Sequence, residues 1–434
     1  MNEQSEQTLW DATAPPGVAW PSLQGAQDCE IAIIGAGVAG LSLALHLADR
    51  GLRPVVLEAD AEAAGGAGRS AGVVAPQLVR HTPESVAKAL GAAAADKLLR
   101  LVAEGAAYSF SVIGDRKIDC GASQAGFLAP ARGAAGATKV ADIARGWAPI
   151  RSDLQVIQGA DVESLTGCTG YAAAILDPTG GSLNPLAYLR LLAREAVAAG
   201  AGLFTGSRIR AVERQGGRWL LRSAAGQLTA DRVVACANHG NLALHPKLAQ
   251  TVLTMPVTQV ATVPFSDEER RAILPGGQAM TDMEPDVLSL RFDPGARLVT
   301  AYPIGRHGHR APSLTRLVNA RLSAAVPGLT PKALDYAWTG LVVINPSLLP
   351  RLVALDDNFF ALQACNGRGL ALNTVIGREL AAWLAGQRQA GWALVPEAAR
   401  PISGYVVAQY LPLLLMKLAL LRQNGVGRWR PSNG

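Results

Sequence analysis

The sequence predicts an α/β fold (α+β overall), in which a Rossmann-type dinucleotide-binding domain carries an inserted domain built on an antiparallel sheet. Three observations support this prediction. CEIAIIG reads as a buried strand and is followed by a glycine turn, a helix and the strand RPVVLEA. NFFALQACNGRGLALNTVIGRELAAWLAG repeats the order strand, glycine loop, helix near the other end of the chain. Between them, strands with alternating apolar residues are typical of an antiparallel sheet.

Length and composition narrow the class of protein. A chain of 434 residues favours two domains. The 40 basic and 34 acidic residues leave a net charge of +6 without a basic block, and only 5% of residues are aromatic, so we expect no nucleic-acid partner. The five cysteines form no CxxC pair, and the polar N-terminus is no signal peptide, which together indicate a cytoplasmic protein without disulfides or a metal site.

The order of elements predicts a discontinuous domain. VAGLSLALHLADRG is a helix that Gly51 ends, and Asn184 and Pro185 begin a second helix that reaches Gly200. Three strands follow in SRIRAVERQ, GRWLLRSA and GQLTADRVVACAN. Further helices are expected at 87–110 and 314–325. The predicted dinucleotide-binding domain comprises 27–88, 152–250 and 340–390, the inserted substrate domain 89–151 and 251–339, and a C-terminal helix and tail 391–434.

The C-terminal segment 405–423 is strongly apolar and leaves two interpretations open. Pro412 and Lys417 interrupt it, and its uncharged run is too short to span a bilayer. A helix packed on the protein is one interpretation. A helix that lies on a membrane surface or docks on a partner is the other.

The first glycine turn matches a dinucleotide-binding fingerprint. Gly35, Gly37 and Gly40 form GxGxxG between a strand and a helix, and Glu58 ends the next strand. Gly35 permits the tight turn, Gly37 lets a pyrophosphate approach the helix N-terminus, and Gly40 lets helix and sheet pack closely. Glu58 is placed to hold ribose hydroxyls. The fingerprint alone does not separate NAD from FAD.

A second glycine-rich stretch, GGAGRSAGVV at 65–74, follows Glu58 directly. Its small residues suit a loop that wraps an extended ligand. Arg69, alone among them, is suited to meet a phosphate or to polarise a ring. A flexible surface loop is the alternative. We call residues 65–74 the second glycine segment.

With these motifs the sequence resembles the D-amino-acid-oxidase-like superfamily of FAD enzymes, which includes glycine oxidase and sarcosine oxidase. It is most similar to the gamma-glutamylputrescine oxidase-like branch, whose GASGRNGG-type segment corresponds to GGAGRSAG. The resemblance covers about Trp10 to Gly386. It extends to DPTGGSLNP, YAWTGLVVINPSLLPRL and the QACNGRGLALN loop.

The resemblance implies FAD as cofactor and assigns residues to it. Those residues are Gly35, Gly37, Val38, Ala39, Gly40, Glu58 and Ala59 for adenosine and pyrophosphate; Gly68, Arg69, Ser70 and Gly72 for the phosphate, ribityl chain and flavin edge; Ile209 for adenine; Ala237 and Asn238 against the cofactor; and Gly367, Arg368, Gly369 and Leu370 at the pyrimidine end. A positive charge at Arg368 would stabilise reduced flavin.

Several residues depart from the family pattern. Ala67 stands where serine is frequent, Ala71 replaces a glycine, and Arg368 stands where the branch often has histidine or lysine. The stretch 340–345 has no cysteine of the kind that tethers flavin in some members, so we expect non-covalent FAD. Cys365 lies close enough in sequence to merit a check.

The resemblance implies oxidation of a C–N bond to an imine by hydride transfer to flavin N5, with oxygen as acceptor. WTGLVV lacks the arginine that holds an amino-acid carboxylate in many members, unless Arg291 or Arg306 replaces it. We therefore expect a small amine as substrate, with an amino acid as the wider alternative. Arg291, Trp338 and Arg368 are the catalytic candidates, although Arg291 also suits a surface strand and Trp338 a core. Tyr302 and Asn345 are weaker candidates.

Two other functions stay open. One is a flavin dehydrogenase that passes electrons to quinone or to a protein acceptor at the membrane surface, through 405–423. The other is a non-enzymatic protein that FAD stabilises. A disulfide reductase is excluded, because the chain has neither a second GxGxxG nor a redox cysteine pair.

Overall fold

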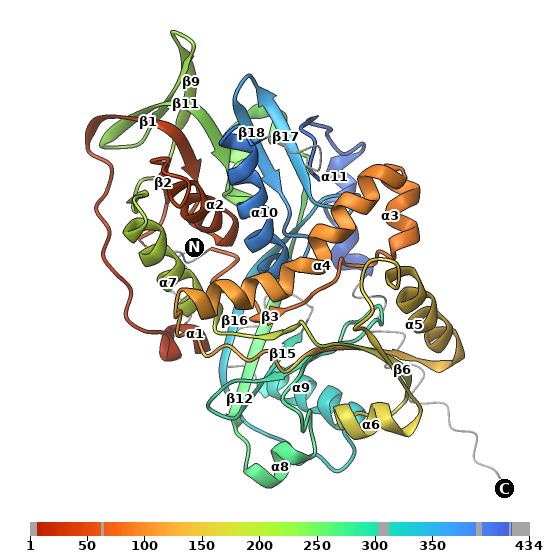
Figure 1. Ribbon diagram of the computed structural model, residues 1–434. Coiled ribbons are helices and arrows are strands. Elements are labelled where there is room, and N and C mark those ends of the chain that lie inside the picture. Colours follow the sequence, from red (N-terminus) through yellow and green to blue (C-terminus); the bar gives the residue numbers. More distant parts are fainter. Residues whose placement is uncertain (1–6, 62–64, 303–311, 388–392, 416–417, 419–434) are drawn as a thin grey trace, which may run out of the picture.

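The computed structural model describes residues 7–61, 65–302, 312–387, 393–415 and 418. Two large sheets dominate the molecule. A nine-stranded sheet occupies one end and an eight-stranded sheet the other, and a long helix crosses between them (Figure 1). The predicted architecture, a parallel sheet with helices beside a mainly antiparallel sheet, is confirmed.

The nine-stranded sheet has a parallel centre. Its strands are β1 (Gly25–Ile34), β2 (Val55–Leu57), β8 (Gly202–Phe204), β9 (Ala211–Gln215), β10 (Arg218–Arg222), β11 (Gly226–Ala235), β17 (Arg351–Asp356), β18 (Phe359–Gln363) and β19 (Glu397–Ala398). β18, β11, β1, β2 and β8 are parallel neighbours in that order. β9 and β10 extend β11 as antiparallel strands.

Helices cover one face of this sheet. They are α2 (Val38–Ala48), α7 (Pro185–Ala198), α10 (Gly369–Leu384) and α4 (Ala92–Asp115). α2 packs against α7 and α10, and α4 packs against α10. Ile31 and Ile33 of β1 join the core beneath these helices, whereas Ala32 and Ile34 join the core on the opposite face, as strand alternation requires.

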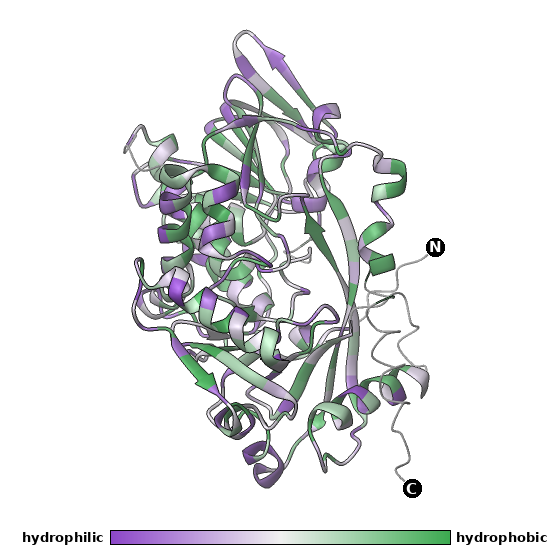
Figure 2. Ribbon diagram, turned by 90° about the vertical axis from the view of Figure 1, so that its right-hand side faces the viewer, coloured by the Kyte–Doolittle hydropathy of each residue, from purple (hydrophilic) through white to green (hydrophobic). Residues whose placement is uncertain are grey.

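Two local signals in the sequence formed as expected. Asn184 caps α7, because its side-chain oxygen accepts from the N–H groups of Leu186 and Ala187, at 3.1 and 3.0 Å. The hairpin β9–β10 projects from the sheet, and its outer strand is mostly hydrophilic (Figure 2).

The eight-stranded sheet has the order β16, β12, β15, β14, β13, β4, β6, β5. The strands are β4 (Phe127–Arg132), β5 (Gln155–Gln158), β6 (Tyr171–Asp177), β12 (Leu253–Pro264), β13 (Ala279–Thr281), β14 (Ser289–Phe292), β15 (Arg297–Tyr302) and β16 (Leu334–Ile344). All neighbours are antiparallel except β4 and β13. Helix α9 (Pro312–Ala325) covers one face through Leu314, Val318 and Leu322.

Sheet membership at two places and helix packing at a third differ from the predicted domain segments. β5 and β6, at 155–177, belong to the eight-stranded sheet, whereas the sequence suggested that the dinucleotide-binding domain resumes at 152. β16 continues past 340 in the same sheet. Helix α4 lies in a segment given to the substrate domain but packs against α10. Strand pairing over long sequence separations decides these memberships, and it leaves no local signal.

The exposure of the C-terminal segment contradicts one of the two interpretations that the sequence left open. Helix α11 (Tyr405–Ala408) has its C-cap at Gln409, and residues 411–415 are helical again. Val406, Val407 and Tyr410 are 73%, 70% and 64% exposed, so the interpretation of a helix packed on the protein is wrong for these residues. Among the described helices, none combines the length and apolar character that crossing a bilayer requires.

Candidate cofactor and active site

Three parallel strands bring the predicted cofactor residues to one edge of the nine-stranded sheet. β1, β11 and β18 are neighbours, and their carboxyl ends lead into Gly35, into Ala237–Asn238 and into the 364–369 loop. Helices α2 and α10 begin directly after the first and third of these loops, so both N-termini lie at this edge. Backbone N–H groups at helix N-termini attract phosphate and other anions.

The first glycine turn has the shape that a dinucleotide needs. Gly35 has φ +105°, and a Cβ there would lie 2.8 Å from the Cα of Ala237. A Cβ at Gly40 would lie 2.0 Å from the Gly35 oxygen, so α2 can approach the turn only through a glycine. A Cβ at Gly37 would meet nothing within 4 Å, which leaves open space over the first turn of α2.

Glu58 lies beside this turn, at the end of β2. Its carboxylate accepts from the N–H groups of Ala36, at 2.7 Å, and Asp60, at 3.1 Å. Burial raises the pKa of Glu58 above its ordinary value. The Glu58 carbonyl accepts from Ser207 N–H, which brings the buried Ile209 nearby. Within the described residues, neither the N–H nor the C=O of Ile209 has a hydrogen-bond partner.

The second glycine segment is held by a row of consecutive carbonyl bonds. Each carbonyl from 69 to 72 accepts from a donor elsewhere in the fold. The pairs are Arg69 with the Trp338 indole (3.0 Å), Ser70 with the Trp10 indole (2.8 Å), Ala71 with Arg291 Nε (2.6 Å) and Gly72 with Leu183 N–H (2.9 Å). The loop is therefore fixed, and the alternative of a flexible surface loop is wrong for the part that the structure describes.

Arg291 is buried, so its interpretation as a surface-strand residue is wrong. Its side chain is 2% exposed, Nη2 donates to the Leu183 carbonyl at 3.1 Å, and the guanidinium lies 4.6 Å from the centre of the Trp10 ring. A Cβ at Gly72 would lie 2.5 Å from Nη2, so only glycine fits against it. Burial lowers the pKa of Arg291 to about 10, which keeps the group charged at neutral pH.

The other substrate candidates lie in different surroundings. Trp338 is fully buried with Trp10, at 5.5 Å between ring centres and 75° between planes, so it occupies the core position that the sequence left open. Tyr302 packs against the core beneath α9. Asn345 holds a turn, because its amide donates to the Leu349 carbonyl. Arg306 lies outside the described residues.

The 364–369 loop presents Arg368 at the N-terminus of α10. The backbone turns at Gly367, with φ +84°, and Arg368 N–H donates to the Cys365 carbonyl. The half-buried guanidinium lies 5.5 Å from the centre of the Phe127 ring and has no carboxylate partner among the described residues. Burial lowers the pKa of Arg368 to about 10, so it remains a cation at pH 7.

Unpaired polar groups at this edge test whether a cofactor fits. Ser70 Oγ and Asn366 Nδ2 are buried and have no hydrogen-bond partner among the residues that the structure describes. Burying such groups costs free energy unless a partner is supplied. Together with the open space at Gly37 and the unpaired Ile209 backbone, they fit an extended dinucleotide that runs from Glu58 to Arg368.

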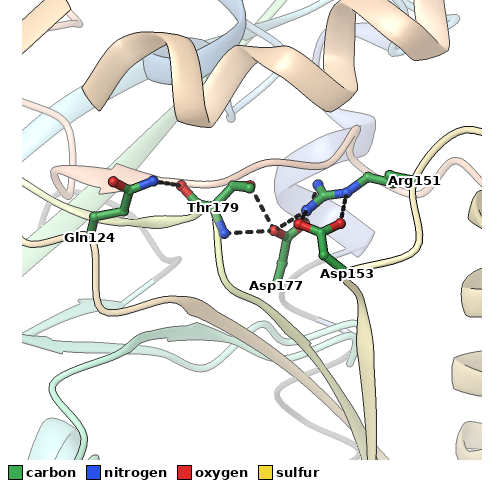
Figure 3. A network of polar contacts seen from close by, with 5 residues as sticks. All are labelled: Gln124, Arg151, Asp153, Asp177 and Thr179. Carbon is green, nitrogen blue, oxygen red and sulfur yellow. Dashed lines mark hydrogen bonds and ion pairs between the residues drawn. The ribbon is translucent and has the colours of Figure 1, made fainter. Parts of the chain in front are cut away.

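A buried ion pair fixes the turn that leads into the strand beside the second glycine segment. Arg151 donates to both oxygens of Asp177, at 2.8 and 2.9 Å, and also binds Asp153 (Figure 3). Asp177 accepts in addition from the Thr179 N–H and hydroxyl. This fixes the turn into β7 (Gly181–Ser182), which pairs with β3 (Val73–Val74) at the end of the second glycine segment.

A parallel sheet with a glycine turn that opens a helix is typical of dinucleotide-binding proteins. The family model described as "DAO: FAD dependent oxidoreductase" matches residues 30–383. The chain therefore belongs to this family, and FAD is its cofactor.

Individual relatives agree with the family. The chain is 26% identical over 386 residues to gamma-glutamylputrescine oxidoreductase of Escherichia coli (strain K12), covering 88% of this chain and 89% of that protein. Among solved structures, glycine oxidase from Geobacillus kaustophilus matches with a TM-score of 0.72 at 18% identity, over 87% of this chain and 100% of that one. L-proline dehydrogenase from P. horikoshii matches with a TM-score of 0.71 at 15% identity, over 85% and 95%. The structural likenesses support the fold.

Sequence reasoning missed Trp10. The residue is 1% exposed and bonds to the second glycine segment, although it lies in an otherwise polar N-terminus. A signal was present: Thr8 and Asp11 form a capping box around the apolar pair Leu9 and Trp10, which indicates a short docked helix.

Proposed function

We propose that the protein oxidises a C–N bond of a small primary or secondary amine, with FAD bound non-covalently. The proposed cofactor contacts are those named from the resemblance, from Gly35 to Leu370. When bound, FAD supplies the hydride acceptor for the carbon next to the substrate nitrogen. The chain contributes binding, orientation and charge: α2 and Glu58 hold the adenosine end, and Arg368 offers a positive charge at the other end.

One observation carries the choice of an amine over an amino acid. Arg291 is bonded to the Ala71 and Leu183 carbonyls and is not free to hold a substrate carboxylate. The segment Trp338–Val343 has no arginine either. A carboxylate without a guanidinium partner would bind poorly at a desolvated site. This supports amines that have no carboxylate on the carbon next to the reacting nitrogen, such as the free putrescine end of the compound that names the E. coli relative.

An anaerobic screen tests the proposal. We expect gamma-glutamylputrescine-like and other small amines to bleach the flavin absorbance, and glycine and sarcosine to be slower by at least a hundredfold in reduction rate. Reduction by glycine or sarcosine, with no amine active, would overturn the choice of substrate. Release of the flavin into the supernatant on acid precipitation would show that FAD is not covalently attached. Cys365 is the residue whose attachment to flavin this experiment checks.

We propose oxygen as the electron acceptor. We also propose that the protein acts in the cytoplasm, and the five free cysteines support this location. A dehydrogenase that reduces quinone or a protein acceptor is the second candidate, and the exposed apolar side chains of 405–418 favour it. Peroxide yield in air, measured against the rate with a soluble quinone, separates the two. Stoichiometric peroxide supports an oxidase, and fast quinone reduction with little peroxide supports the dehydrogenase.

A further inference from the structure

The first eighteen described residues form a strap, residues 7–24, that runs over the molecule before β1 begins (Figure 1). Asn184 donates to the Thr13 hydroxyl at 2.9 Å, and Arg190 donates to the Pro15 carbonyl at 2.7 Å. Further along, Thr205 N–H donates to the Pro21 carbonyl. The strap is thus tied to α7 and to the turn after β8 at several points.

The strap begins with helix α1 (Leu9–Thr13), which carries Trp10 into the interior. Leu9, Trp10 and Trp338 share one apolar cluster, and Arg291 lies over the Trp10 ring. The Trp10 indole N–H reaches the Ser70 carbonyl at 2.8 Å. The Trp10 ring therefore contacts Trp338 and Arg291, which both donate hydrogen bonds to the second glycine segment. Trp10 donates a third such bond.

The hydrogen bonds to these carbonyls also determine the direction of the N–H groups in the same peptides. In a trans peptide, the carbonyl of one residue and the N–H of the next point in opposite directions. Trp10 holds the Ser70 carbonyl, so it turns the Ala71 N–H away from the strap. Arg291 does the same for the Gly72 N–H. Neither N–H has a partner within the described residues, and the Ser70 hydroxyl beside them is also unpaired.

We propose that Trp10 is a positioning residue of the flavin site: its indole N–H fixes the Ser70–Ala71 peptide so that the Ala71 N–H faces FAD. The inference rests on the proposed cofactor contacts of the second glycine segment. It makes the strap a part of the cofactor site, although the strap lies outside the residues that the family model matches.

The variant W10F tests this, because it keeps an aromatic ring and removes the indole N–H, although part of the indole volume is lost with it and the control must lose the same volume. The matched control is W219F. Trp219 is also buried, donates its indole N–H to a carbonyl, that of Asp357, at 3.1 Å, and meets Phe359 edge to face, but it lies in β10, outside the cofactor edge. FAD affinity, the visible flavin spectrum and the flavin midpoint potential are measured for both.

We expect W10F to bind FAD about tenfold more weakly, since a buried carbonyl loses its donor, and to shift the flavin spectrum and potential. W219F should leave all three unchanged. Wild-type values in W10F, or equal changes in both variants, would overturn the inference. If W10F does not fold, T8A/D11A, which removes the capping box of α1, is expected to weaken FAD binding about threefold. No substrate is used, so failure here is distinct from failure of the proposed amine oxidation.

Discussion

At the scale of single residues, Arg368 allows a prediction about flavin chemistry. Arg368 has no carboxylate partner in the described part of the chain, and such a cation beside flavin would favour the added negative charge of the reduced form. R368M should therefore lower the two-electron midpoint potential by roughly 30 mV or more, which corresponds to about 1.4 kcal/mol. Potentiometric titration measures this. R368K keeps the charge and should remain within about 10 mV of the wild type, whereas an unchanged potential in R368M would remove Arg368 from the site.

Asp282 gives a prediction about pH. Burial raises its pKa from 3.8 to about 6, although it accepts from the Tyr171 hydroxyl and the Leu288 N–H. Between pH 4 and 6 the unfolded chain ionises Asp282 before the folded protein does, so this group lowers the free energy of unfolding as pH rises. In D282N that loss is absent.

We therefore compare the midpoint temperature of thermal unfolding of D282N with that of the wild type. The difference, D282N minus wild type, should increase from pH 4.5 to pH 7. The change corresponds to roughly 2–3 kcal/mol. D267N, which removes an exposed carboxylate in α8 (Asp267–Arg271), is the control and is measured over the same pH range. Parallel curves for wild type and D282N would show that Asp282 does not titrate in this range.

At the scale of elements, the pair of Arg151 and Asp177 holds the β6–β7 turn. Arg151 and Asp177 side chains are 10% and 1% exposed, so removing either partner leaves a buried charge. R151M should lower the free energy of unfolding by about 3–5 kcal/mol. Because β7 pairs with β3, the variant should also bind FAD more weakly. Urea denaturation and a FAD titration measure the two effects.

D153N is the matched control for this pair. Asp153 binds the same Arg151, but its side chain is 45% exposed, and exposed ion pairs contribute about 1 kcal/mol or less. A loss in D153N as large as in R151M would mean that the exposed ion pair, and not the buried one, holds the turn.

At the scale of the whole molecule, the exposed C-terminal segment leads to a prediction about membrane binding. Val406, Val407, Leu411, Leu414, Leu415 and Leu418 are exposed, and the sequence from 416 to 434 contains four basic residues and no acidic one. Apolar side chains next to basic ones favour anionic bilayers. The protein should therefore co-sediment with vesicles that contain phosphatidylglycerol more than with neutral vesicles.

V406N/V407N/L414N should reduce this vesicle binding at least tenfold, because three apolar side chains no longer enter the bilayer. V156N changes an exposed apolar residue of β5 and should have no effect. Equal binding by all three proteins would locate the lipid contact elsewhere, and no binding by the wild type would weaken the dehydrogenase candidate.

The sequence predicted the parts of this molecule that depend on near neighbours. The turn from Gly35 to Gly40, the cap at Asn184 and the hairpin β9–β10 all formed as expected, since each is encoded within a few residues. The burial of Arg291 and the docking of Trp10 were not predictable, because their partners lie 220 and 60 residues away. The assignment of individual residues to FAD stays a prediction.

The bond between Trp338 and the Arg69 carbonyl joins positions 269 residues apart. During translation the glycine turn, α2 and the second glycine segment leave the ribosome long before β16 does. The nascent chain therefore carries the glycine turn while the Arg69 carbonyl still lacks its indole donor from β16. Closing so long a loop is entropically costly and slow. Under the proposed cofactor contacts, the second glycine segment reaches its final hydrogen bonding only after β16 (Leu334–Ile344) has been made.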